Sequence, residues 1–174
     1  QQIKPQDPVN IRAAGRMGKL HDLLRASGYT GHALEVLLVR LLFCLFAEDT
    51  SLFDQKDAFH DFIENCTRED GSDLGPQLAY LFQILNTKIE ERQKNLDDSL
   101  AYFPYVNGRL FEEPLPIVNC SREIRELLLD CCALDWGQIS PAIFGALFQC
   151  VMDEEGSARR RNLPAPVRRD PLRR

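Results

Sequence analysis

The 174-residue sequence has no apolar run long enough to cross a bilayer. Its most hydrophobic stretch, Val36 to Ala47, stops at Glu48 after about a dozen residues, a length typical of a buried helix. The first residues include neither the basic nor the apolar segment of a secretion signal, and there is no initiating methionine. We therefore expect no membrane contact and a cytoplasmic location, and we interpret the chain as a fragment of a longer protein.

The sequence also lacks the spacings that hold metals or disulfide frameworks. No C-x-x-C pair occurs, and the cysteines lie within helical patterns, so reduced and mostly buried thiols are predicted. The histidines are far apart and have no partner at metal-ligand spacing. The cysteines are Cys44, Cys66, Cys120, Cys131, Cys132 and Cys150, and the histidines are His21, His32 and His60.

Catalytic signatures are missing as well. The string GRMG at 15–18 has the wrong spacing for a phosphate-binding loop, and no G-x-S-x-G elbow is present. The string DQK at 54–56 offers half of a nuclease motif, but no second carboxylate on a strand accompanies it. We predict no catalytic, cofactor-binding or metal-binding residue in this chain.

Two pairs of adjacent acids, Glu48-Asp49 and Glu112-Glu113, could be read as acid-base or metal carboxylates. Neighbouring side chains on a helix point about 100° apart, so such pairs do not converge by themselves. Solvation of a helix end or loop is the favoured interpretation. For Glu48-Asp49 a second interpretation stays open, a buried polar anchor where the apolar helix meets the next loop.

Charge is unevenly distributed along the chain. The residues from Arg159 to the end include seven arginines and one aspartate, which gives +6 and leaves −11 on residues 1–158. An acidic body is a poor partner for phosphates, so we expect it to meet DNA only indirectly. The basic tail could be a phosphate-seeking arm or an end without function.

Apolar residues at three-and-four spacing predict a mainly α fold, an irregular bundle of about five to seven helices. Asn10 can cap a first helix that Gly28 closes. The segment 33–47 is apolar on most sides, so we expect it at the centre. Asp54 is the expected cap of a third helix, and Ser72 or Asp73 that of a fourth.

Two further helices are predicted to begin at Ser121 and at Ser140-Pro141, with Trp136 filling their junction. The polar segment 87–98 is expected to be a surface helix or an exposed connection. By these patterns the chain divides into a flexible lead-in (1–9), a helical domain (10–153) and a tail (154–174) in which disorder is expected.

The segment 103–118, FPYVNGRLFEEPLPIV, differs from the rest in its aromatics and prolines. Asn107-Gly108 between apolar runs favours a small β-hairpin, and an ordered aromatic loop is the alternative. Its side chains could form an interaction surface that stacks on a base or a partner, or the rings could simply cover the end of the core. The candidate residues are Phe103, Tyr105, Arg109 and Phe111.

Four strings together resemble the helical spacer of MmeI-like restriction-modification proteins. They are GYTGHALEVLLVRLLFCLFAEDTSLF (28–53), TREDGSDLG (67–75), FPYVNGRLFEE (103–113) and DWGQISPAIFGALFQCVMD (135–153). In that family, the spacer joins an N-terminal nuclease domain, where present, to an adenine-specific methyltransferase domain that uses S-adenosylmethionine, followed by a target-recognition domain. The resemblance covers roughly residues 10–155 and carries over no catalytic residue.

The resemblance implies a non-catalytic connector whose partners are the methyltransferase and target-recognition domains. A free-standing helical protein-interaction module and an enzyme in its own right are the alternative hypotheses. After Asp153 the sequence departs from the family, because the string that opens the methyltransferase domain is replaced by arginines and PAPVRRDPLRR. This difference suggests a truncated product or an excised domain, whose uncovered apolar surface would favour self-association.

Overall fold

The computed structural model describes residues 8–142 and 145–146, which contain six α-helices and two 3₁₀ turns and no strand. The predicted mainly α fold is confirmed. The elements are α1 (Pro8–Ala26), α2 (Gly31–Asp49), α3 (Ala58–Cys66), α4 (Leu74–Leu85), η1 (Ile89–Glu91), α5 (Asp98–Ala101), α6 (Arg122–Cys132) and η2 (Trp136–Gln138).

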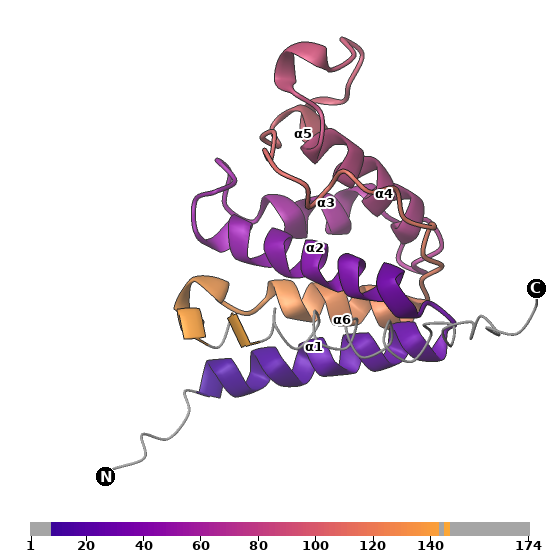
Figure 1. The fold of residues 1–174 in the computed structure, drawn as a ribbon, viewed down its shortest axis with the longest axis vertical. Helices are drawn as coiled ribbons and strands as arrows, with labels where there is room; N and C mark the ends of the chain where they lie inside the picture. Colours follow the sequence, from indigo (N-terminus) through magenta and orange to yellow (C-terminus); the bar gives the residue numbers. More distant parts are fainter. Residues whose placement is uncertain (1–7, 143–144, 147–174) are drawn as a thin grey trace, which may run out of the picture.

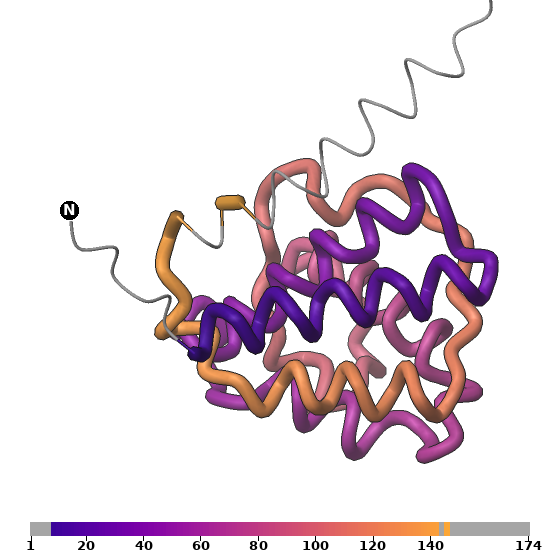
Figure 2. The backbone as a smooth tube through the Cα atoms, turned by 90° about the horizontal axis from the view of Figure 1, so that it is seen from below, coloured from indigo at the N-terminus to yellow at the C-terminus, as the bar shows by residue number. Residues whose placement is uncertain are grey.

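The apolar helix α2 lies at the centre of the arrangement, as its composition predicts. It packs against α1, α3 and η2, and α6 lies side by side with α1 beneath it (Figures 1 and 2). Buried residues occur on most sides of α2, including three charged ones. A helix surrounded in this way holds the remaining elements around one continuous core.

The turn between α1 and α2 closes as the glycine signal predicts. Gly28 has φ +95°, a conformation that glycine adopts without steric cost. Its N–H donates to the Arg25 carbonyl at 3.0 Å, and the Tyr29 N–H donates to the Leu24 carbonyl at 3.1 Å. This pair of bonds is the Schellman motif that ends many helices.

The predicted starts of α4 and α6 are confirmed at Asp73 and Ser121. The Ser121 hydroxyl accepts the Ile124 N–H at 3.2 Å. The segment before α6 crosses closely over the first turn of α4, where a Cβ added to Gly75 would lie 1.7 Å from the Val118 carbonyl oxygen. Only glycine permits this crossing.

The predicted cap of α3 was wrong by three residues. The helix begins after Asp57, not Asp54, and Asp57 has φ +61°. A left-handed aspartate is less common than a left-handed glycine, and periodicity carries no information about it. The residues between α2 and α3 therefore form a longer loop than the pattern indicated.

The hairpin proposed for 103–118 does not form. No strand occurs in this segment. Its main chain is tied to helices by the Phe103 N–H, which donates to the Leu100 carbonyl of α5 at 3.2 Å, and by the Val106 N–H, which donates to the Leu85 carbonyl of α4 at 2.8 Å. Gly108 has φ +135°, so the Asn-Gly pair does turn the chain. The alternative, an ordered aromatic loop, is confirmed.

Several expectations fall outside the described residues. They are the lead-in up to residue 7, most of the helix expected from Ser140, Cys150 and the basic tail. Within the part that the structure does describe, no helix is long and apolar enough to cross a membrane.

Candidate interaction surface

The aromatic loop contributes its phenylalanines to the core. Phe103 and Phe111 are 2% and 4% exposed, whereas Tyr105 is half-buried and Arg109 is exposed. The two buried rings are therefore not available to stack on a nucleotide base. The predicted interaction surface stays a prediction for Tyr105 and Arg109.

The buried rings belong to a continuous series of phenylalanines that joins four segments. Phe111 lies 5.6 Å from Phe43 of α2 and 5.5 Å from Phe82 of α4, between ring centroids. Phe53 connects Phe43 to Phe103, at 6.3 Å and 5.2 Å, in edge-to-face geometry. Such pairs add to the stability gained from burial, so the series fixes the loop to the helices.

Arg40 of α2 lies beneath this loop and is 2% exposed. Its Nε donates to the Leu110 carbonyl at 2.8 Å and its Nη2 to the Glu113 carbonyl at 2.6 Å. The guanidinium lies 5.3 Å from the centroid of Phe82 and 5.6 Å from that of Phe111. Burial lowers the pKa of Arg40, and the nearby Glu113 carboxylate opposes that shift. The arginine holds the loop through its main chain.

Two more arginines hold irregular segments in the same way. Arg92 donates to the carbonyls of Thr87, Ile84 and Phe103 at 3.1, 3.1 and 2.7 Å. The buried Arg125 of α6 donates to the Thr67 hydroxyl at 2.9 Å. Because charge-assisted bonds to carbonyls are strong, these side chains define loop positions that apolar packing alone would leave open.

Glu48 and Asp49 form the buried polar anchor that the sequence left open as a second interpretation. Glu48 is 2% exposed, and its Oε2 accepts the His60 N–H of α3 at 2.9 Å. Asp49 Oδ2 accepts the Trp136 N–H of η2 at 2.8 Å. The two adjacent carboxylates thus join the end of α2 to two separate elements.

Burial raises the pKa of Glu48 to about 7, and the donated His60 N–H partly opposes this. The neighbouring acids Asp49 and Asp57 raise it further. Glu48 Oε1 is buried without a hydrogen-bond partner among the described residues. The raised pKa of the Glu48 carboxyl reflects its desolvation inside the fold.

The described cysteines are all free thiols, and Cys44, Cys131 and Cys132 are buried. Burial raises the pKa of Cys120 to about 11 and that of Cys131 to about 12. It also raises the pKa of Cys44 and Cys132. Protonated thiols of this kind are poor nucleophiles and poor metal ligands.

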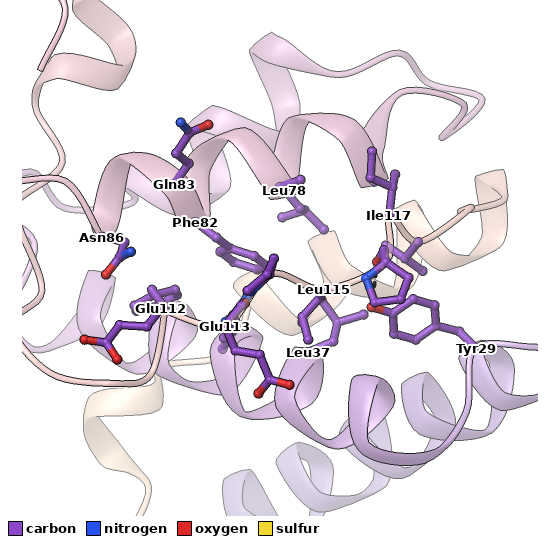
Figure 3. A pocket seen from close by; sticks show the side chains of 17 residues that line it. Tyr29, Leu37, Leu78, Phe82, Gln83, Asn86, Glu112, Glu113, Leu115 and Ile117 are labelled. Carbon is purple, nitrogen blue, oxygen red and sulfur yellow. Dashed lines mark hydrogen bonds between the residues drawn. The ribbon is translucent and has the colours of Figure 1, made fainter.

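A groove of 280 Å³ opens between α2, α4 and the end of the aromatic loop (Figure 3). Apolar residues make most of its lining, and Tyr29 stands at one end, where its hydroxyl donates to the Pro116 carbonyl at 2.8 Å. Glu113 lies at the rim, and its carboxylate meets His32 Nε2 at 2.8 Å. The lining holds an arginine and two glutamates but no nucleophile paired with a base.

The segment that follows η2 lies against the start of α1. The Ser140 N–H donates to Asn10 Oδ1 at 3.4 Å, which joins the first turn of α1 to the segment after η2. Trp136 lies buried at this end, and its Nε1 donates to the Cys131 carbonyl at 2.8 Å. Figure 1 shows the orange segment that follows α6 above the start of α1.

No cluster of three or more metal-ligand side chains occurs in the described part of the chain. The buried Arg40, Glu48 and Arg125 instead bind main-chain atoms of neighbouring segments. Sequence patterns missed this role for Arg40 and Arg125, although an arginine inside an apolar helical run is a usable signal of a buried, bonded cation.

A helical body whose buried charged side chains bind the main chain of its own loops is a structural module. Residues 32–111 match the family model described as "MmeI, helicase spacer domain". DNA methyltransferase A of Bacillus subtilis (strain 168) is 38% identical over 158 residues, which cover 88% of this chain and 18% of that protein. The solved structure of the Type IIL restriction-modification enzyme MmeI in complex with DNA matches with a TM-score of 0.77 and 62% identity, over 86% of this chain and 20% of that one.

The resemblance to the spacer domain of MmeI-type restriction-modification enzymes that the sequence shows is confirmed. The chain spans about a fifth of the length of the relatives that it matches. Those relatives are a DNA methyltransferase and a restriction-modification enzyme, and this chain corresponds to one segment of each.

Proposed function

We propose that this chain is a non-catalytic connector that holds the flanking domains of an adenine-specific, S-adenosylmethionine-dependent DNA methyltransferase in a fixed relation. The bond between Ser140 and Asn10 carries the proposal. This bond holds the segment that follows η2 against the first turn of α1, so two stretches of chain that are 130 residues apart in the sequence keep a fixed relation. Its partners are then the methyltransferase and target-recognition domains, with DNA met indirectly.

Rigidity is the physical requirement for such a role, and the buried charges supply it. Arg40, Arg92 and Arg125 hold loops, while Glu48 and Asp49 join α2 to α3 and η2. The bonds of Arg40 to Leu110, Arg125 to Thr67 and Trp136 to Asp49 join residues 70, 58 and 87 positions apart in the sequence, so the body resists local rearrangement. A connector of this kind contributes to activity through geometry alone.

A chimeric enzyme tests the proposal. This chain replaces the matched segment of the B. subtilis DNA methyltransferase A, and N6-methyladenine formation on DNA is measured. We expect the chimera to retain methylation, and we expect a control with a short Gly-Ser linker in the same place to lose it. Full methylation with the linker would contradict the positioning role and favour an independent interaction module.

The isolated chain provides the second test. Calorimetry with S-adenosylmethionine should show no binding to the 174-residue protein, because the cofactor site is assigned to the methyltransferase domain. Saturable binding would instead identify the chain as an enzyme domain in its own right.

A further inference from the structure

Helix α4 presents an uncharged face to solvent. No charged residue occurs from Leu74 to Thr87, although 27% of the chain is charged. Ala79 and Gln83 are exposed on this face and line the groove, and Tyr80 beside them is 42% exposed. A partner that covers this face of α4 would bury no charged side chain of the helix. The free-energy cost of desolvating the face is therefore small.

The opposite wall of the groove is a segment with unused main-chain donors. Residues 114–118 run without helix or turn, and Pro114 and Pro116 favour extended backbone in themselves and in the residues before them. In the described part of the chain, no hydrogen bond uses the N–H of Leu115 or Ile117. In an extended chain, the N–H groups of residues two positions apart point to the same edge. The free N–H groups of Leu115 and Ile117 therefore lie on one edge of this segment.

Ile117 is 57% exposed at this wall (Figure 3). An exposed aliphatic side chain beside free donors is the arrangement by which an extended peptide adds to a strand edge. Pro114 and Pro116 do not prevent this addition, because their nitrogen atoms, which carry no hydrogen, face the opposite edge of the segment.

Arg40 lies at the floor of the groove. Its Nε and Nη2 bind the loop, and Nη1 makes no hydrogen bond with any described residue. The Glu113 carboxylate lies close enough to raise the pKa of Arg40, so the guanidinium already has one negatively charged neighbour. A neutral oxygen, from a main-chain carbonyl or an amide, therefore suits Nη1 better than a second carboxylate does.

We propose that this groove binds an extended, uncharged segment with an aliphatic side chain, supplied by another domain of the parent protein. The segment pairs with the edge at Leu115 and Ile117, places its side chain against Leu78 and Phe82, and directs an oxygen to Arg40. The source of the segment rests on the proposed function. The chemistry of the groove is independent of it.

Labelled peptides test the inference with the full 174-residue chain. Overlapping peptides that tile the B. subtilis DNA methyltransferase A outside the matched segment are titrated with the chain and followed by fluorescence anisotropy. We expect binding to concentrate in peptides with an uncharged, aliphatic core. Absence of binding by every peptide would overturn the proposal.

Two matched pairs of variants locate the site. Ala79→Glu places a carboxylate on the α4 face and should weaken peptide binding about tenfold or more, whereas Ala14→Glu on the exposed side of α1 should leave it unchanged. Ile117→Pro removes a main-chain donor and should weaken binding by a similar factor, while Ile117→Ala keeps the donor and should retain most of it. Circular dichroism verifies that each variant is folded.

If Ala79→Glu and the unsubstituted chain bind the peptide with equal affinity, the groove beside α4 is not the binding site. If Ile117→Pro and Ile117→Ala bind it with equal affinity, the peptide does not pair with the main chain at residue 117. Sedimentation tests for a second copy, since a dimer that Ala79→Glu dissociates would show the groove to be a self-association surface instead. The chimera reports on the connector role separately. Lost methylation with peptide binding intact would contradict that role and leave this inference standing.

Discussion

Arg40 and Glu48 stand two turns apart on α2, are equally buried, and are held very differently. Arg40 has two hydrogen bonds to loop carbonyls, two aromatic faces and a nearby carboxylate. Glu48 has one bonded oxygen and one without a partner, with two further acids in its surroundings. The comparison shows that neighbouring segments can satisfy one buried charge with hydrogen bonds and leave an equally buried charge only partly satisfied.

The largest effect is expected from Phe111→Ala, which breaks the series of rings and uncovers Arg40. Loss of a buried phenylalanine costs roughly 4 kcal/mol of unfolding free energy. Urea denaturation followed by the fluorescence of the single tryptophan measures it. Tyr102→Ala, at a ring that is 67% exposed, is the control and should change stability little.

Arg40→Met should lower the unfolding free energy by roughly 3 kcal/mol. The substitution preserves much of the apolar stem but leaves the carbonyls of Leu110 and Glu113 without their donor. The same denaturation assay applies, with the exposed Arg109→Met as the matched arginine control. A loss as small as that of the control would show that the loop keeps its position without the guanidinium.

Glu48 should make stability fall as pH rises. Its pKa is about 7 in the folded chain against an ordinary 4.5, so the folded state binds the proton more tightly than the unfolded state. The added stability is complete below about pH 4.5 and is lost between there and about pH 7, by roughly 3 kcal/mol.

Glu48→Gln should flatten this pH dependence, and unfolding measured from pH 5 to pH 8 tests it. The variant should be more stable than the unsubstituted chain at pH 8 and similar to it at pH 5. Glu126→Gln, at an exposed position of α6, should keep the original profile. An unchanged slope in Glu48→Gln would show that another group titrates.

The smallest effect is expected at the other half of the anchor. Asp49→Asn weakens the acceptor for the Trp136 N–H and should cost about 1 kcal/mol, with a shift in tryptophan emission. Asp54→Asn alters an exposed loop acid nearby and should change neither. An emission spectrum of Asp49→Asn identical to that of the unsubstituted chain would show that the Asp49 carboxylate does not determine the environment of the Trp136 ring.

Local signals predicted much of this fold. The spacing of leucines located α2, and Gly28, Asp73 and Ser121 each marked a helix end. Such features depend on neighbours within a few residues, which a sequence displays directly.

The candidate surface was harder to predict, because long-range contacts build it. Arg40 binds carbonyls 70 and 73 residues away, and Trp136 binds Asp49 over 87 residues. The Asn-Gly pair favoured a hairpin, but the rings of Phe103 and Phe111 gained more by entering the core than their segment could gain by pairing with itself. Periodicity also could not indicate the left-handed Asp57.

The meeting of Asn10 and Ser140 has an evolutionary consequence. A folded unit with adjoining ends can be spliced into a host gene, or deleted from one, with little displacement of the sequences on either side. Recombination can thus exchange a segment bounded by two such adjoining positions between large enzymes without moving the flanking sequences apart.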